Sequence, residues 1–225
     1  MKRYFVPNQK FSKRAKRQRF DNPELQFDYD PVKFSEGPKI KTMKLPPGYR
    51  YPVRPAVLKQ FIQKLKSIEP FYFFNIYWIR LTNFIDTSYY GTFWWQGMVD
   101  LHPYKWDSDR QLFLTLLGRT DDKFPEEGFG SRLIMIENNA YLSWKYEKDL
   151  ANFTMNNVLM HEIGHSLASM RQERFDENLI EEFAQSYLHD PSRHKELLEY
   201  WRESIISTPR LKKHYRDWLK EVTAK

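Results

Sequence analysis

The spacing of apolar residues divides the chain into regions of different character. Residues 1–54 show no sustained period of 3.6 or 2 residues, and eight of the 13 prolines lie within the first 55 residues. This composition predicts a largely extended arm. From Pro55 the apolar residues recur at helical spacing as far as Pro70, so we expect the folded domain to begin with a helix there.

Short apolar and aromatic runs follow this helix and predict strands. They are FYFFNIYWIRL (71–81), RQLFLTLLG (110–118) and RLIMIEN (132–138). After Asn152 the pattern is helical, with interruptions near 171–176 and at Pro191 and Pro209. Strands followed by helices predict an α+β fold. We therefore expect an arm over 1–54 and one domain over 55–225, with helix and sheet in 55–150 and helices in 151–225.

Composition narrows the classes of protein. A chain of 225 residues with 41% hydrophobic residues can bury one sizeable core. No apolar stretch approaches the roughly 20 residues that cross a bilayer, and no apolar signal core follows the first residues, which predicts a soluble cytoplasmic protein. The chain contains no cysteine. Any bound metal must therefore use His, Asp or Glu.

The net charge of +7 is concentrated at the N-terminus, where residues 1–20 contain eight Lys and Arg and no acid. A solvated disordered tail is the common explanation for such a run. However, residues 1–54 also carry nine aromatics: Tyr4, Phe5, Phe11, Phe20, Phe27, Tyr29, Phe34, Tyr49 and Tyr51. We expect the arm to dock on a protein or nucleoprotein assembly and not on a membrane. Residues 2–19 leave nucleic acid open as a partner.

The segment LMHEIGHSLASM (159–170) predicts a helix with two histidines on its polar side. At about 100° per residue, His161 and His165 fall about 40° apart and face away from the apolar stripe. Glu162 flanks the same polar face, and Gly164 leaves room for close backbone approach on another side. The stripe consists of Leu159, Met160, Ile163, Leu167 and Met170.

This HExxH spacing has a chemical reason. Imidazoles at i and i+4 can bind one zinc ion at about 2 Å each, and the glutamate between them can reach a metal-bound water. Zinc lowers the pKa of that water toward 7, and Glu162 can accept its proton as a general base. The alternative is a pair of surface histidines that happen to lie one turn apart.

A catalytic zinc site needs a third protein ligand. Ala168 and Arg171 exclude the extended motif that ends in a further histidine. In the next helix, ENLIEEFAQSYLHD, Glu181 lies beside the apolar stripe and Glu182 points almost oppositely. Glu177 lies nearer the stripe in angle but occupies the first turn, where acids are common. The helical wheel therefore favours Glu181 and leaves four alternatives open: Glu177, Glu182, His189 and Asp176.

HEIGH followed by EEFAQSY resembles the metallopeptidase domain of the anthrax lethal factor-like zinc peptidases, a gluzincin type. The resemblance covers about residues 155–220, and the family pattern places its zinc-binding glutamate on Glu181. It implies a zincin fold, in which a twisted sheet lies over the HExxH helix and an edge strand pairs with an extended peptide substrate. RLIMIE (132–137) is the expected edge strand, although its alternation equally suits a plain half-buried strand.

The sequence departs from the family at two places. Gln185 replaces an acid, and Ser166 to Ile180 contains no tyrosine where the family has its transition-state tyrosine. Arg171, Arg174 or an aromatic residue near Tyr141 would have to stabilise the oxyanion instead.

The expected function is a zinc-dependent endopeptidase with Glu162 as general base and His161, His165 and Glu181 as Zn²⁺ ligands. The alternative is a weakly active or inactive zincin-fold structural component that its arm anchors in a large nucleoprotein assembly. The stretch SYYGTFWWQG (88–97) fits either a core hairpin or a wall of the substrate site. His102 and His214 receive no functional role.

Overall fold

The computed structural model describes residues 38–85, 90–94, 97–116, 129–170 and 176–223, which form an α+β fold. Expectations for residues 1–37 fall outside the described residues and stay predictions. None of the helices in the described ranges combines the length and the apolar character needed to cross a bilayer.

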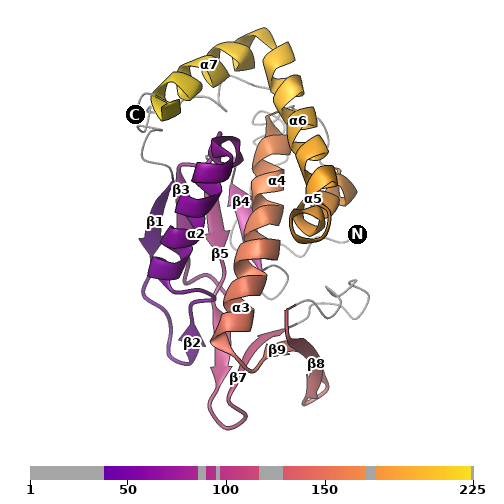
Figure 1. Cartoon of the computed structure of the whole chain (residues 1–225). Coiled ribbons are helices and arrows are strands. Elements are labelled where there is room, and N and C mark those ends of the chain that lie inside the picture. Colours follow the sequence, from indigo (N-terminus) through magenta and orange to yellow (C-terminus); the bar gives the residue numbers. More distant parts are fainter. Residues whose placement is uncertain (1–37, 86–89, 95–96, 117–128, 171–175, 224–225) are drawn as a thin grey trace, which may run out of the picture. The chain divides into compact units, whose positions relative to one another are not determined.

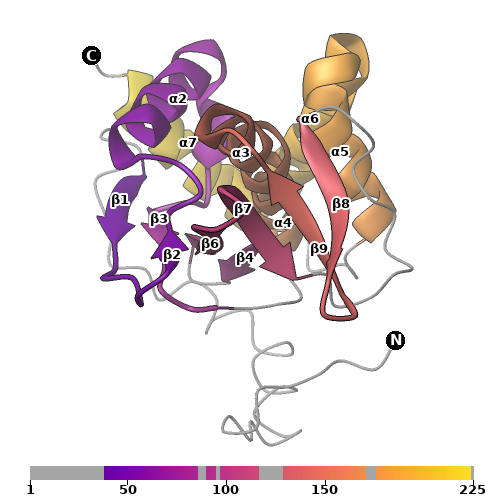
Figure 2. The same cartoon turned by 90° about the horizontal axis from the view of Figure 1, so that it is seen from below.

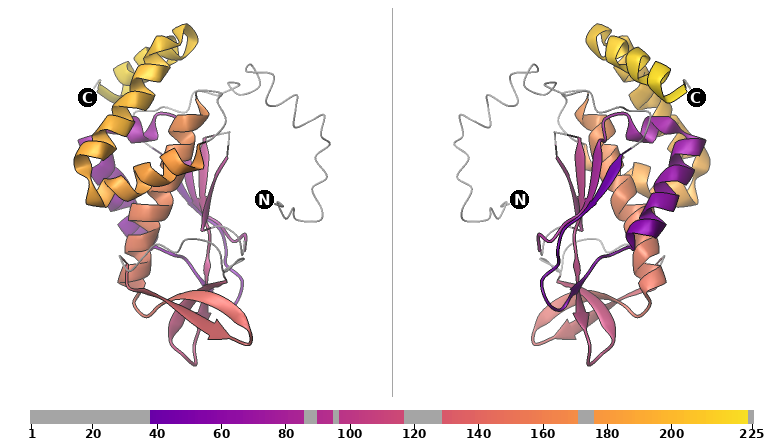
Figure 3. Two further views of the ribbon diagram at one scale, coloured as in Figure 1. Left: turned by 90° about the vertical axis from the view of Figure 1, so that its right-hand side faces the viewer. Right: turned by 90° about the vertical axis from the view of Figure 1, so that its left-hand side faces the viewer.

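A four-stranded sheet lies beside the HExxH helix. Its order is β1 (Lys39–Thr42), β3 (Trp78–Leu81), β5 (Met98–Leu101) and β4 (Gly91–Trp94). The first three strands are parallel, and β4 runs antiparallel to β5 at the edge. Helices pack on one face of this sheet, as Figure 3 shows. Alternate strand residues supply the buried face: Ile79, Leu81, Val99 and Leu101 are fully buried.

A second, five-stranded sheet is antiparallel throughout. Its order is β2 (Tyr49–Arg50), β6 (Tyr104–Asp107), β7 (Leu112–Leu116), β9 (Asn139–Trp144) and β8 (Ser131–Ile136). In Figure 2, β8 and β9 form a hairpin next to α3 (Glu147–Phe153). The expected substrate strand, RLIMIE, is therefore an edge strand of this second sheet. The strand that contacts the HExxH helix most is β4 of the other sheet, and the expected role of 132–137 in binding substrate stays a prediction.

The folded domain begins before Pro55, which corrects the predicted boundary of the arm. β1 pairs in register with β3, β2 pairs with β6, and Val53 is fully buried. These strands have four and two residues, too short to show a period. Two lysines in β1 suit the edge of a sheet.

The predicted helix from Pro55 is confirmed as α2 (Pro55–Ile68), whereas the predicted strand over 71–81 is only partly correct. Pro70–Phe73 forms a 3₁₀ helix, η3, in which the Glu69 side chain accepts a hydrogen bond from the Phe71 N–H. Only Trp78–Leu81 is a strand. A continuous apolar run indicates burial but does not by itself separate a strand from a buried helical turn.

The HExxH motif lies near the C-terminal end of a continuous helical rod, which Figure 1 shows running past both sheets. The rod consists of α3, a π-helical turn over Thr154–Val158 labelled η4, and α4 (Leu159–Ser169). Leu159, Ile163 and Leu167 are fully buried, as the wheel predicted. The histidines therefore occupy the face of α4 that is turned away from its core stripe.

Three helices follow: α5 (Glu177–His189), α6 (Pro191–Ser207) and α7 (Pro209–Thr223). Pro191 and Pro209 interrupt the helical pattern, as predicted, and each stands at the first position of the helix that follows. α5 packs tightly on α4 at Gly164, where an added Cβ would lie 3.1 Å from Ile180 Cγ2 and 3.3 Å from Phe183 Cδ1. The lack of a side chain at Gly164 lets the glutamates of α5 approach the histidines.

His194 of α6 fastens α5 and η3 together. Its side chain is buried; Nε2 lies 2.8 Å from the Tyr72 hydroxyl and Nδ1 lies 3.0 Å from the Phe183 carbonyl oxygen. The Phe183 carbonyl can only accept, so Nδ1 carries the proton and Nε2 accepts from Tyr72. Burial lowers the pKa of His194 below its usual 6.5, and the bond to Phe183 only partly opposes this shift.

This histidine is expected to make the domain less stable in mild acid. Because its pKa is lower in the folded chain, the unfolded chain binds the proton more readily, and stability falls as the pH drops below about 6.5. Urea unfolding of the metal-free protein at pH 7.5 and 5.5 checks this. His194→Gln, which cannot titrate, should show a smaller loss between the two pH values. An equal loss in both proteins would contradict the prediction.

Candidate metal centre

The two histidines of α4 direct ring nitrogens at each other. His161 Nε2 and His165 Nε2 are 3.0 Å apart, and both side chains are largely buried, with 25% and 18% exposed. Two nitrogens bound to one tetrahedral zinc, each at about 2.0–2.1 Å, would lie about 3.3 Å apart. The separation in the chain thus comes close to that of two ligands of one ion.

Glu177, in the first turn of α5, completes a cluster of three ligand atoms with the histidines. Its Oε2 lies 3.5 Å from His165 Nε2 and 3.9 Å from His161 Nε2. These distances and the N–N distance form a triangle whose sides are near the edge of a zinc tetrahedron. Two imidazoles and one carboxylate are a donor set that suits zinc and leaves a fourth position for water or substrate.

Glu181 lies one turn further along α5 and contacts the other nitrogen of His161. Its Oε2 is 3.1 Å from His161 Nδ1, and its Oε1 accepts a hydrogen bond of 2.9 Å from the Gln185 amide. This bond keeps the His161 proton on Nδ1 and leaves the Nε2 lone pair facing His165 and Glu177. Glu181 therefore orients the His161 ring, and Gln185 orients Glu181.

The titration behaviour of these groups agrees with their contacts. The hydrogen bond from His161, more than any other contact, lowers the pKa of Glu181. Burial lowers the pKa of His165 to about 4, and the nearby His161 adds to that shift. Burial also opposes protonation of His161, but Glu181, Glu162 and Glu177 together raise its pKa. A carboxylate beside a histidine nitrogen favours the charged imidazole in the absence of a cation.

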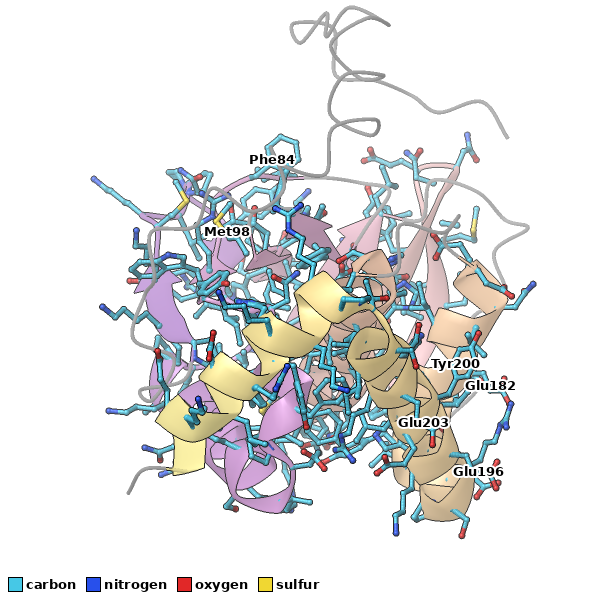
Figure 4. The ribbon with its side chains drawn as sticks, turned by 90° about the horizontal axis from the view of Figure 1, so that it is seen from above. Phe84, Met98, Glu182, Glu196, Tyr200 and Glu203 are labelled. Atoms are coloured by element: carbon cyan, nitrogen blue, oxygen red, sulfur yellow. The ribbon has the colours of Figure 1, made fainter. Side chains whose placement is uncertain are left out.

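The remaining candidates for a third ligand either bond to other groups or lie away from the two histidines. Glu182 forms an ion pair of 2.8 Å with Arg193, and Figure 4 shows it beside Glu196 on the outer side of α5 and α6. Asp176 caps α5 by accepting from the N–H groups of Asn178 and Leu179. His189 is exposed at the other end of α5. The cluster therefore contains Glu177 and not Glu181, which the helical wheel had favoured.

The wheel could not separate these two glutamates because it records only angles. Glu177 and Glu181 differ by about 40° around the axis, so both face α4. They differ by about 6 Å along the axis, at 1.5 Å per residue. That axial offset sets Glu177 against the Nε2 atoms and Glu181 against Nδ1, and it depends on where α5 begins after the turn between the helices.

Glu162 is buried between α4 and the edge strand β4, with only 6% of its surface exposed. Burial raises the pKa of its carboxyl to about 7, while the nearby His161 and a hydrogen bond from the Phe93 backbone N–H act in the opposite direction. A carboxyl group tuned to this range is suited to exchange protons near neutral pH.

Gly91 allows β4 to lie against the HExxH helix. A Cβ at this position would be 2.8 Å from Val158 Cγ1 and 3.1 Å from Glu162 Cγ. Sequence reasoning missed the role of this strand. The dipeptide GT within an aromatic stretch gives no periodic signal, and the proximity of the strand to α4 is a tertiary contact.

The aromatic stretch 88–97 contributes this edge strand. Trp94 is 42% exposed, and its Nε1 donates to Asp100 Oδ2 at 2.8 Å. Asp100 is itself held by two hydrogen bonds of 2.6 Å from Arg80. The interpretation of the stretch as a wall of the substrate site therefore stays a prediction; Trp95 lies outside the described residues.

The other sequence candidates lie elsewhere. Arg171 and Arg174 fall outside the described residues, and Tyr141 lies in β9, paired with Leu116 and Ile134. His102 is buried and lies 3.1 Å from the Thr92 hydroxyl. His214 packs on the Phe74 ring. The identity of an oxyanion-stabilising group stays a prediction.

Searches against known protein families, characterised proteins and solved structures return no match for this chain. The resemblance to the lethal factor-like peptidases is therefore supported by its motif residues alone.

Proposed function

We propose that this protein is a zinc-dependent endopeptidase with the fold of the zincins. The observation that carries the proposal is the position of Glu162. A buried carboxyl group, that of Glu162, lies on the same helix as two histidines whose nitrogens converge with a second carboxylate, that of Glu177. A site that only stabilised the fold would gain nothing from this carboxyl, because burying a carboxyl group costs free energy.

In this proposal each residue has a separate role. His161, His165 and Glu177 hold the ion, and Glu181 fixes the tautomer of His161. A bound zinc ion supplies Lewis acidity toward the scissile carbonyl and toward water. Glu162 accepts the proton of the attacking water and passes it to the amine that leaves.

The edge strand supports the choice of a peptide as substrate. β4 is the last strand of its sheet and lies directly against the helix that carries Glu162. An extended peptide can add to such an edge through main-chain hydrogen bonds, with little dependence on its sequence. The antiparallel edge strand beside an HExxH helix also supports the zincin fold that the resemblance implies.

The test begins with the metal and the reaction in the same preparation. Purified protein is expected to contain about one zinc per chain and to cut unstructured polypeptides in a reaction that a chelator stops and added zinc restores. Zinc-loaded protein that cuts nothing across a diverse peptide library would overturn the enzymatic proposal. The metal site would then support the alternative, a structural component anchored by its arm.

A further inference from the structure

The backbone of β4 presents two different sides. The carbonyls of Tyr90 and Trp94 accept hydrogen bonds of 3.0 and 2.9 Å from His102 and Gly97, so these residues direct their main-chain groups toward β5 and the turn that leads to it. In an antiparallel pair the direction alternates from residue to residue. Gly91 and Phe93 therefore direct their N–H and C=O groups outward, toward the edge of β4 that pairs with none of the described strands, here called the free edge.

The Phe93 N–H does not simply face solvent at this edge. The carboxylate of Glu162 reaches the strand from α4, and a hydrogen bond with the Phe93 backbone is one of the influences that oppose the rise of its pKa. The close approach at Gly91, where Glu162 Cγ lies within 3.1 Å of an ideal Cβ position, brings the side chain alongside the strand. The Glu162 side chain therefore lies within reach of the outward backbone groups of β4.

We propose that the Phe93 backbone N–H is a positioning group that fixes the orientation of Glu162 at the free edge of β4. The catalytic meaning of this contact rests on the proposed peptidase function, but the contact itself does not. It also limits the substrate: a peptide that adds to β4 can bond the Phe93 carbonyl but not the Phe93 N–H. In this arrangement the Phe93 N–H bonds the general base, and the Phe93 carbonyl is left for the substrate.

The contact is tested without catalysis by amide hydrogen exchange. The Phe93 N–H is expected to exchange slowly in the wild-type protein although it takes no part in the ladder with β5. Glu162→Ala removes the acceptor and should speed exchange of Phe93 by at least about tenfold, since a hydrogen bond to a charged group is worth that much or more. Glu162→Gln keeps an acceptor oxygen and should preserve much of the protection.

The amides of Asp100 and Val99 in β5 serve as internal references, because they lie in the strand paired with β4 and should not respond to either substitution. Fast exchange of Phe93 in the wild-type protein would overturn the proposal. So would slow exchange that persists in Glu162→Ala.

The functional consequence is tested by removing only the donor. Phe93→Pro deletes the N–H and, because that group points away from β5, breaks no ladder hydrogen bond. Phe93→Ala loses the same aromatic side chain but keeps the N–H, which makes it the matched control. We expect kcat of the proline variant to fall about 10- to 100-fold below that of the alanine variant, with KM within about twofold.

The outcomes separate this inference from the proposed function. Equal kcat for the two variants would show that the N–H does not position the base, even in an active peptidase. If the wild-type protein were inactive, the exchange experiment would still decide whether Phe93 holds Glu162. If Phe93→Pro did not fold, the exchange result for Glu162→Ala would decide the same point.

Discussion

Replacing Glu162 with glutamine is expected to reduce peptide cleavage by at least about 10²–10⁴-fold, the contribution of a positioned general base. Glutamine has nearly the same size and keeps an oxygen that can accept from the Phe93 N–H, but it cannot take a proton from water. Because the substitution leaves His161, His165 and Glu177 untouched, the zinc content should not change. Cleavage of a fluorogenic peptide and metal analysis on the same sample measure both quantities.

Glu182→Gln is the matched control for this experiment. The same chemical change then falls on an exposed glutamate that pairs with Arg193 on the far side of α5. Its cleavage rate should stay close to that of the wild-type protein, because surface ion pairs contribute little. Cleavage that survived in zinc-loaded Glu162→Gln would show that another group is the base.

A second large effect is expected on metal affinity when the residues of the cluster are replaced one at a time. His161→Ala, His165→Ala and Glu177→Ala each remove a ligand atom, and protein purified from these variants should contain almost no zinc. Glu181→Ala removes only the partner of His161 Nδ1 and should weaken zinc binding by about 10- to 100-fold. Glu182→Ala should have no measurable effect. Competition with a chromophoric chelator gives the affinities.

The comparison of Glu177 and Glu181 is the informative one. If Glu181→Ala abolished zinc binding while Glu177→Ala only weakened it, the ligand would be Glu181, as the helical wheel and the family resemblance favoured. The two residues lie four apart on one helix face, so equal disruption of α5 by either alanine is expected. A difference in their effects would therefore report on the metal and not on folding.

The pattern of apolar residues was sufficient for the elements whose period persists over several turns. The helix from Pro55, the helices after Pro191 and Pro209, and the polar placement of His161 and His165 all follow from spacing alone. Their periodicity can be read from the sequence because each helix buries one apolar stripe along its length.

Features that depend on tertiary contacts could not be predicted from the spacing of apolar residues. β1 and β2 are too short to show alternation, and they were assigned to the arm because prolines are frequent before Pro55 and no sustained period appears there. The alternation of β8 identified an edge strand but not the sheet to which the strand belongs. Glu177 was ranked behind Glu181 because acids are common in the first turn of a helix. The angle around the axis does not include the height along it, which sets each glutamate against a different histidine nitrogen.

The π-helical turn at Thr154–Val158 has a consequence for how the chain tolerates insertions and deletions. One helical rod serves two sheets: α3 packs against β9 of the five-stranded sheet, and α4 packs against β4 and β5 of the four-stranded sheet. A π turn holds one residue more than an α turn, so it sets the rotation between these two faces. Deleting one residue there, such as Asn157, would restore an unbroken α-helix and leave the HExxH face close to its present direction relative to α3, whereas deleting one residue within the regular turns of α3 would turn the residues after it by about 100° relative to those before it. The rotation about the helix axis, more than the composition of the helix, would then decide whether His161 and His165 still face Glu177.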